Sequence, residues 1–423
     1  MMFSTWGALA GLVLAIVLIV RKVTPAYALV FGALAGGLLG GGGLQETVKA
    51  MISGTQSMMP SVLRILTSGV LVGALVKTGA AEKIADSVMR IFGSRFALAA
   101  VAFSAMVVTA VGVFVDIAVI TVAPVALAMG RKAGLPVSSL LVAMVGGGKA
   151  GNVISPNPNT IAVADAFKCD LTSVMAANWI PAVCSLAMTV ALSSWLARRD
   201  RFKRPEASIE IQEGASSSLS SLPPVWAAFA GPLTVVALLA LRPVAGFAID
   251  PLVALPAGGI VSVLACGKWR RMVEYSEYGM GRVLGVSVLL IGTGAVAGVV
   301  KASGLNTDMI AALNALKMPA FALAPLSSFL LSGATASTTA GVTIAGQTFS
   351  ETLLQSGIPA LSAAAMLHAG GTIIDALPHG SFFHATAGAV GMSVKERLRL
   401  FPYGTLVGLT SAVTSVIVYL LGI

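Results

Sequence analysis

Two stretches of the chain resemble each other and together decide the fold. They are GLPVSSLLVAMVGGGKAGNVISPNP, residues 134–158, and GIPALSAAAMLHAGGTIIDALPHGS, residues 357–381. In each, a proline is followed by an apolar run, and glycine, proline and polar residues then interrupt the run. A single offset of about 223 residues aligns these stretches and also the rest of the two halves. The chain is therefore predicted to contain two copies of one structural unit.

The composition places both copies in a membrane. Hydrophobic residues make up 57% of the chain and charged residues only 10%, and the mean hydropathy is +0.92. Soluble domains carry about 25% charged residues. Apolar runs recur from end to end and approach the roughly 20 residues that a spanning helix needs. We therefore expect an all-α polytopic membrane protein in the cell (inner) membrane. The net charge of +10 fits basic cytoplasmic loops and indicates no nucleic-acid partner.

No cofactor or metal site is expected. The three cysteines are scattered singly, without metal-ligand spacing. A metal site built from His368, Asp375, His379 and His384 is disfavoured because Pro378 interrupts any regular helical spacing among them. The sequence also has no phosphate-binding GxxxxGK[ST] motif, so ATP-driven transport within this chain is not expected.

The distribution of basic residues predicts the topology. Residues 96–130 are apolar with basic residues just outside both ends, too long for one crossing and too short for two, so we expect a re-entrant hairpin. Each repeat then has five spanning helices, one of them broken, and one hairpin. Because five is odd, the second repeat is inverted relative to the first. Such inverted repeats with broken helices are typical of secondary transporters.

The predicted segments follow from this count. The first repeat covers residues 1–197, with scaffold helices in 1–76, the hairpin 96–130, the broken helix 137–167 and a helix at 173–196. A basic and serine-rich cytoplasmic linker covers residues 198–223. The second repeat covers residues 224–423, with its hairpin at 319–354 and its broken helix at 359–390.

The two hairpin tips and the two helix breaks carry the candidate site. Unwound backbone at membrane depth frees amide groups at helix ends, where an anion is favoured. Candidate substrate-binding residues are Asn152, Ser155, Asn157, Asn159, Thr160, Thr335, Ser337, Thr338, Thr339, Gly370 and Gly371. Asp116, Asp375 and His379 could carry a coupled proton, because ionisable residues inside a membrane usually line a polar pathway. Lys149 and Asp165 also lie in or beyond the first break, whereas His368 fits a packing role.

Four segments resemble the gluconate permease (GntP) family of the ion-transporter superfamily. They are GVFVDIAVITVAPVALAMGRKAG (112–134), NVISPNPNTIAVADAFKCDL (152–171), SGATASTTAGVTIAG (332–346) and GGTIIDALPHG (370–380). The resemblance implies proton-coupled uptake of gluconate or a related hydroxy acid. It also implies a homodimer of elevator type, whose transport domains move against a fixed scaffold.

By position, Asp116 occupies a tip site where the family usually has a glutamate, and Asp375, Pro378 and His379 match its Asp-x-Leu-Pro-His element. Thr335, Ser337, Thr338 and Thr339 match its hydroxyl-rich tip. In the first break the family has a histidine and then a Pro-Pro-His-Pro-Gly-Pro run, whereas this chain has Asn152 and SPNPNT. This departure leaves the identity of the carried hydroxy acid open.

The sequence thus predicts a symporter of a small organic anion and not an enzyme. A sodium-coupled citrate or dicarboxylate symporter with the same architecture remains an alternative, since carbonyl groups at the tips could coordinate sodium. An intramembrane enzyme would use Asp375 with His379, but it would not require two repeats. A channel is less favoured, because no residues resemble a selectivity ring.

Overall fold

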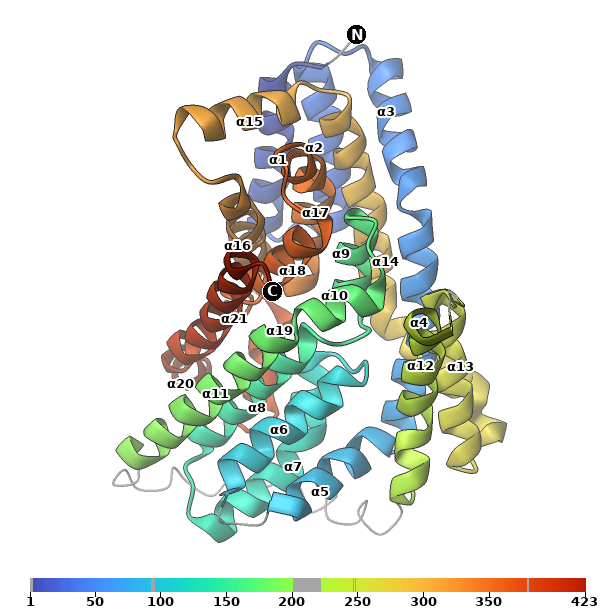
Figure 1. Ribbon diagram of the computed structural model, residues 1–423, viewed down its shortest axis with the longest axis vertical. Coiled ribbons are helices and arrows are strands. Elements are labelled where there is room, and N and C mark those ends of the chain that lie inside the picture. The colour runs from blue at the N-terminus through green and yellow to red at the C-terminus, as the bar shows by residue number, and fades with distance from the viewer. Residues whose placement is uncertain (1–2, 93–95, 201–221, 246, 248, 379) are drawn as a thin grey trace.

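The computed structural model describes the chain except for residues 1–2, 93–95, 201–221, 246, 248 and 379 (Figure 1). Over this described part the secondary structure is helical, and the β-contact found is an isolated bridge between Phe3 and Ser303. The expected all-α architecture is therefore confirmed. Most of the predicted linker, 198–223, lies outside the described residues, between the end of α11 and the start of α12.

Both halves of the chain consist of helices, whose lengths range from the 6 residues of α20 to the 30 residues of α14. The first half comprises α1 Thr5–Val20, α2 Pro25–Leu39, α3 Leu44–Ser57, α4 Met59–Lys77, α5 Ala80–Phe92, α6 Ala97–Ala110, α7 Val115–Ala133, α8 Val137–Asn152, α9 Pro158–Ala166, α10 Leu171–Ala177 and α11 Trp179–Asp200. The second comprises α12 Val225–Ala245, α13 Pro251–Ala265, α14 Met272–Lys301, α15 Leu305–Ala315, α16 Leu323–Thr335, α17 Thr338–Gln355, α18 Ala360–Gly370, α19 Ser381–Gly388, α20 Val394–Arg399 and α21 Phe401–Leu421.

Helices end at the four places where the sequence places its breaks. Residues 111–114 separate α6 from α7, and Gly112 there has a φ of +113°, a conformation that favours glycine. Two residues, Ala336 and Ser337, separate α16 from α17. The interruptions between α8 and α9 and between α18 and α19 cover residues 153–157 and 371–380. Glycine or proline lies in three of these interruptions, because proline lacks the amide hydrogen and glycine permits the turn. Helix α16 ends instead at Ala336, whose φ is +48°.

Three helical segments differ from the predicted layout. Residues 44–57 form α3 and residues 80–92 form α5, and neither segment is apolar enough to be predicted as a spanning helix. These helices are amphipathic and polar on one side, so they lack the long apolar run that marks a spanning helix. The helix expected at 173–196 is divided, because α10 ends at Ala177 and α11 starts at Trp179.

Glycines bring α3 and α4 into direct backbone contact with α14. A methyl group added to Gly54 would lie 2.1 Å from the carbonyl oxygen of Gly294, and one added to Gly73 would lie 1.9 Å from that of Tyr275. A methyl group on Gly69 would lie 2.9 Å from the carbonyl carbon of Gly279. Small residues allow helices to approach this closely in membrane proteins. The crossing of α3 and α4 with α14 is therefore a tight seam through the molecule.

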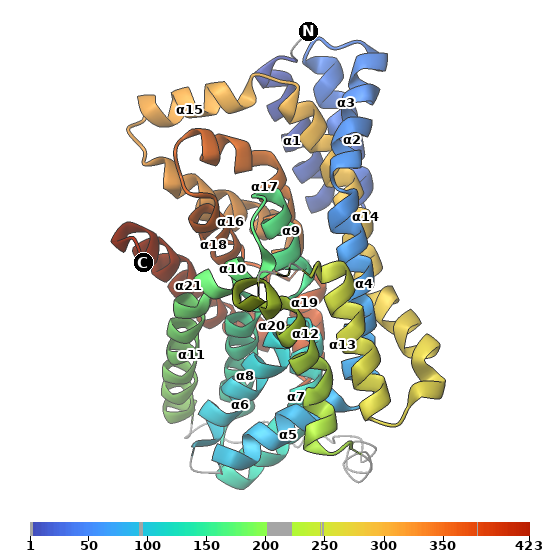
Figure 2. The same ribbon diagram turned by 45° about the vertical axis from the view of Figure 1, so that its right-hand side comes forward.

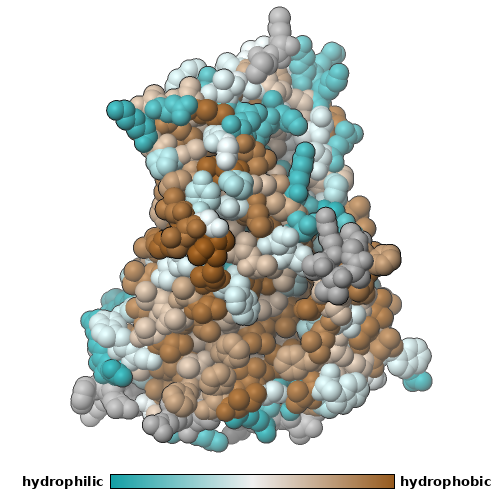
Figure 3. All heavy atoms as spheres, in the orientation of Figure 1, coloured by the Kyte–Doolittle hydropathy of each residue, from teal (hydrophilic) through white to brown (hydrophobic). Residues whose placement is uncertain are grey.

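The outer surface has the character of a membrane protein. Four helical stretches in the described residues are long and apolar enough to cross a membrane: Met59–Lys77, Trp179–Arg199, Trp269–Lys301 and Val394–Leu421. Apolar side chains cover much of the flank, and hydrophilic ones gather over α15 at the upper end (Figure 3). Helices α15 and α5 lie across the long axis at opposite ends of the molecule (Figures 1 and 2).

Candidate functional site

The first break is a network of buried amide side chains. Asn157 is the N-cap of α9, and its side-chain oxygen accepts hydrogen bonds from the backbone N–H groups of Asn159, at 2.9 Å, and Thr160, at 3.2 Å. Its Nδ2 donates to Oδ1 of Asn152 at 2.6 Å, and Nδ2 of Asn159 donates to the same oxygen at 3.0 Å. The three asparagines therefore satisfy one another with neutral groups alone.

Two hydroxyl groups fasten this break to its neighbour. Ser155 Oγ donates to the carbonyl oxygen of Thr109, near the end of α6, at 2.7 Å. Thr160 Oγ1 donates to the carbonyl oxygen of Ser155 at 2.6 Å. Both side chains are fully buried. Their hydroxyl protons are used to hold backbone in place.

The second break carries a charge. Asp375 lies in the unwound stretch between α18 and α19, is 5% exposed, and forms an ion pair with Lys149 of α8, with 2.6 Å between Nζ and Oδ1. Lys149 also donates to the carbonyl oxygens of Thr372, at 2.6 Å, and Gly404, at 3.1 Å. Thr338 Oγ1, at the start of α17, donates to Oδ2 of Asp375 at 2.6 Å. The ammonium group thus ties α8 to the second break and to α21.

Contacts between the halves connect the two breaks. Thr339 Oγ1 donates to Oδ1 of Asn159, next to the bond between Thr338 and Asp375. Asn152 lies three residues after Lys149 on α8, hence on the same side of that helix. Hydrogen bonds, the ion pair and neighbouring positions on α8 and α17 therefore bring six residues together, which we call the polar ring. They are Lys149, Asp375, Thr338, Thr339, Asn159 and Asn152.

The polar ring has the chemistry to recognise a hydroxylated anion. Amide and hydroxyl groups can donate to and accept from hydroxyl groups, and an ammonium can pair with a carboxylate. Four of its members are at most 5% exposed, whereas Thr338 and Thr339 at the second tip are partly exposed. The second tip is therefore the open side of the ring.

Other predicted substrate-binding residues lie beside the polar ring. Thr335 Oγ1 donates to the carbonyl oxygen of Leu331 in its own helix at 2.8 Å. Ser337 is the N-cap of α17 and accepts from the N–H of Ala340 at 3.3 Å. A methyl group on Gly370 would lie 2.5 Å from backbone atoms of Pro325. These residues shape the tip and the packing of α18 on α16.

Gly371 and the remaining proton-carrying candidates have different positions. Gly371 is buried, and an added methyl group would lie 2.3 Å from Val342 of α17. Asp116 is partly buried in the first turn of α7, and the contacts that close the polar ring do not include it. His379 lies outside the described residues. Asp375 is therefore the proton-carrying candidate that the structure places in the ring.

Sequence reasoning did not assign Lys149 a role in the site. The residue that it pairs with lies in the other half of the chain, so spacing gives no indication of the contact. The sequence does contain one indication of such a role, since Lys149 lies within an apolar stretch. A lysine there is costly in a membrane and requires a partner. Lys149 is 3% exposed and has such a partner in Asp375.

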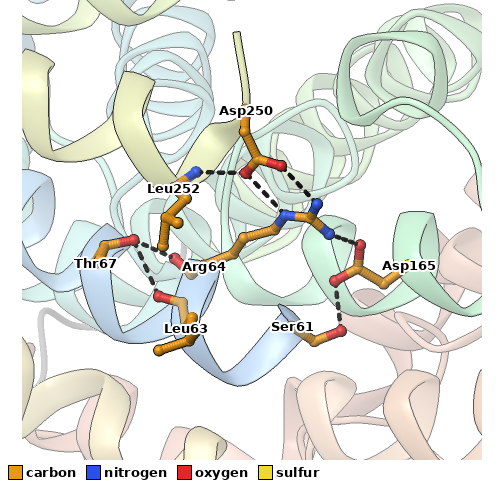
Figure 4. Close-up of polar contacts among 7 residues, drawn as sticks. All are labelled: Ser61, Leu63, Arg64, Thr67, Asp165, Asp250 and Leu252. Carbon is orange, nitrogen blue, oxygen red and sulfur yellow. Dashed lines mark hydrogen bonds and ion pairs between the residues drawn. The ribbon is translucent and has the colours of Figure 1, made fainter. Parts of the chain in front are cut away.

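A second charged cluster lies apart from the polar ring (Figure 4). Arg64 of α4 is placed between Asp165 of α9 and Asp250, with 2.6 Å between Nη2 and Oδ2 of Asp250. Ser61 donates to Asp165, and Asp250 accepts from the N–H of Leu252 at 2.8 Å. The three charged side chains line a pocket of about 190 Å³ between α9, α10 and α13. They link α4 to the far arm of the first broken helix.

Comparison with known proteins identifies the family. A sequence model described as GntP family permease matches residues 4–423. The chain belongs to the GntP permease family. An uncharacterized transporter of Haemophilus influenzae is 46% identical over 416 residues, with 98% of both chains covered. A gluconate permease of Zymomonas mobilis is 21% identical over 365 residues, with 80% of both chains covered.

A solved structure shares the fold. The YdaH transporter of Alcanivorax borkumensis, whose structure is described as having an unusual topology, matches with a TM-score of 0.65 and 18% identity. The match covers 90% of this chain and 89% of that one. Family and fold agree with the apolar helices described above. The protein is a multi-pass, all-α membrane permease and not an enzyme.

Proposed function

We propose that this permease is a proton-coupled symporter that imports gluconate or a related small hydroxy-carboxylate across the cell (inner) membrane. The observation that carries the proposal is the polar ring, which combines amides and hydroxyls with a buried Lys149–Asp375 ion pair. Hydroxyl groups of the substrate would bond to Asn152, Asn159 and Thr339. The name of the Zymomonas mobilis gluconate permease supports this substrate class.

We propose further that the halves are inverted repeats. The glycine seam supports this relation, because one offset of 225 residues relates its glycines in pairs. The pairs are Gly54 and Gly279, Gly69 and Gly294, and Gly73 and Gly298. The contact of Gly54 with Gly294 and the contact of Gly69 with Gly279 are therefore exchanged by this offset, as a two-fold axis requires. The same offset relates the first residues of α5 and α15, Ala80 and Leu305, which start helices at opposite ends of the molecule.

The moving part in this proposal contains the hairpins α6–α7 and α16–α17 and the broken helices α8–α9 and α18–α19. Five of the six residues of the polar ring lie in these helices, and the sixth, Asp375, lies in the break between α18 and α19. An elevator-type motion in a homodimer would carry the ring past a scaffold that contains α3, α4 and α14. The tight glycine seam supports the assignment of these three helices to the scaffold, since backbone in direct contact leaves little freedom to slide.

Asp375 is the favoured proton carrier, because its carboxylate belongs to the ring. Asp116 and His379 remain candidates for a second step on the proton's path. Sodium could replace the proton if carbonyl groups at the tips coordinate it, and citrate or a dicarboxylate would then be the expected substrate class.

Uptake by purified protein in proteoliposomes tests the proposal. Labelled gluconate should accumulate inside the liposomes when the outside is made more acidic than the inside. It should leave again when this proton gradient is collapsed. Accumulation that follows a sodium gradient and ignores pH would refute proton coupling. Failure of gluconate, glycerate, hydroxybutyrate and lactate to accumulate under either gradient would refute the substrate class.

A further inference from the structure

A third charged group lies near the Lys149–Asp375 ion pair. Arg397 of α20 is 2% exposed, and its guanidinium packs on the ring of Phe383, with 5.4 Å between Cζ and the ring centroid. Its Nε donates to Oγ1 of Thr386 at 3.2 Å, but its Nη2 is buried without a partner. Arg397 lies in the helix directly before α21, and the carbonyl oxygen of Gly404 in α21 accepts a hydrogen bond from Lys149. The protein thus buries one cationic nitrogen, Nη2 of Arg397, for which the described chain supplies no acceptor.

The charges of this cluster do not cancel. Lys149 and Arg397 contribute two positive charges and Asp375 contributes one negative charge, which leaves an excess of one positive charge among buried groups. Burying an uncompensated charge is expensive, because it gives up the charge's hydration without a counterion. An arginine is also suited to binding a carboxylate through more than one N–H group. The excess charge and the unpaired Nη2 therefore both indicate that a monoanion belongs in this cluster.

We propose that Lys149 and Arg397 bind the substrate's carboxylate, and that this carboxylate competes with Asp375 for the Lys149 ammonium. The inference rests on the proposed function and specifies its mechanism. A proton that binds to the carboxylate of Asp375 cancels the negative charge there and weakens its ion pair with Lys149. The ammonium group then becomes available to the incoming anion, while Arg397 Nη2 supplies the second contact.

This exchange fixes the stoichiometry. The empty site with ionised Asp375 has an excess of one positive charge, and the site with both the proton and the monoanion has the same excess. The two half-loaded states have a different charge, of zero or plus two. The buried cluster therefore has the same net charge in the two states that cross the membrane, the empty one and the fully loaded one. One proton therefore accompanies each monoanion, and transport is electroneutral.

Other titratable groups near the second break have separate contacts or positions. His384 of α19 lies with Nε2 2.7 Å from the carbonyl oxygen of Pro378. His368 of α18 is fully buried, and neither of its ring nitrogens has a partner. Helix α17 contributes Thr338, and α21 contributes the carbonyl group of Gly404. His379 lies outside the described residues. The exchange is therefore assigned to Asp375, the carboxylate that contacts the ammonium.

A double variant separates substrate binding by Lys149 from a purely structural role. In Lys149→Gln, gluconate affinity should fall by roughly 30-fold or more, as for the loss of one buried charged contact. In Asp375→Asn, gluconate should still bind, but its affinity should no longer depend on protonation at this position. Lys149→Gln with Asp375→Asn restores charge balance within the pair, so it should melt near the wild-type temperature and still fail to bind gluconate, although Asp375→Asn alone binds it.

Several outcomes would overturn the inference. If the double variant binds gluconate as tightly as Asp375→Asn does, Lys149 only neutralises Asp375. If uptake by the wild-type protein responds to an imposed membrane potential at constant pH gradient, transport is not electroneutral; this measurement needs no variant and decides the matter even if the double variant fails to fold. Lys83→Gln is the matched control, since Lys83 pairs with Asp86 within α5, Asp86 keeps a second partner in Arg90, and the loss of Lys83 should leave uptake unchanged. Failure of the wild-type protein to take up any hydroxy acid would instead refute the proposed function.

Discussion

The two helix breaks occupy equivalent positions in the two halves and are built differently. Asn152 in the first corresponds to Asp375 in the second at an offset of 223 residues. The first break unwinds only residues 153–157, and its amide side chains bond to one another. The second unwinds residues 371–380, and its central side chain is a carboxylate held by a lysine of the other half. One break is short, neutral and internally satisfied, whereas the other is long, charged and dependent on its neighbours.

This difference suggests a division of labour. A network of neutral groups with every partner in place keeps its geometry, which suits the recognition of hydroxyl groups. A buried ion pair responds to a proton or to a competing anion, since either one changes the charge balance. We therefore assign shape recognition to the first break and coupling to the second. Exchanging the chemistry of the two breaks tests that assignment.

The largest effect should come from giving the first break a charge. Asn152→Asp adds a carboxylate one turn from Lys149 and cancels the excess positive charge of the cluster. An anionic substrate should then bind roughly tenfold more weakly, or by about 1.4 kcal/mol, at neutral pH. Calorimetric titration with gluconate measures the change.

The matched control for this exchange is Asn178→Asp. Asn178 is a fully buried amide between α10 and α11. Asn178→Asp should therefore lower the melting temperature of the protein without changing its affinity for gluconate. If Asn152→Asp binds gluconate as tightly as the wild type does, the charge balance of the cluster does not govern recognition.

The positions of the breaks could be predicted from the sequence because their cause is local. Glycine and proline interrupt apolar runs at Gly112, Pro156, Gly371 and Pro378, and each lies between two helices in the structure. Helix α3 could not be predicted in this way, since its polar residues hide it from a hydropathy profile and its stabilising contacts lie on α14. Local pattern thus determines where helices stop, but not every place where one forms.

The composition of the site was only partly predictable for a related reason. Asn152, Asn159, Thr338, Thr339 and Asp375 stand out as polar residues inside breaks and tips. The ion pair with Lys149 and the position of Arg397 depend on how the two halves pack, and a single sequence carries no direct signal of such contacts. The sequence alone also could not separate substrate-facing hydroxyls from those that cap helices, because both are serines and threonines in the same short segments.

An intermediate effect is expected when the caps of the two halves are removed. The side chain of Asn157 accepts hydrogen bonds from two backbone N–H groups and donates one to Asn152. The hydroxyl group of Ser337 accepts one hydrogen bond, from the backbone N–H of Ala340 at 3.3 Å. Asn157→Ala should therefore destabilise the protein by about 1 kcal/mol and Ser337→Ala by about 0.5 kcal/mol, the typical value and the low end of the range for N-caps. Melting temperatures of both variants in the same detergent give the order. Equal losses would show that the first break is no more tightly held than the second tip.

The smallest effect should come from Thr335→Val, although Thr335 lies only three residues before Thr338. Its hydroxyl group donates to the carbonyl oxygen of Leu331 within α16, so its removal leaves that carbonyl with its helical bond and uncovers no charge. Stability should change by less than about 0.5 kcal/mol, and gluconate uptake should stay within about twofold of the wild type. In contrast, Thr338→Val removes the donor to Asp375 and should change the pH dependence of uptake. If both variants affect uptake equally, the hydroxyl groups of the second tip act together, and Thr335 belongs to the polar ring as well.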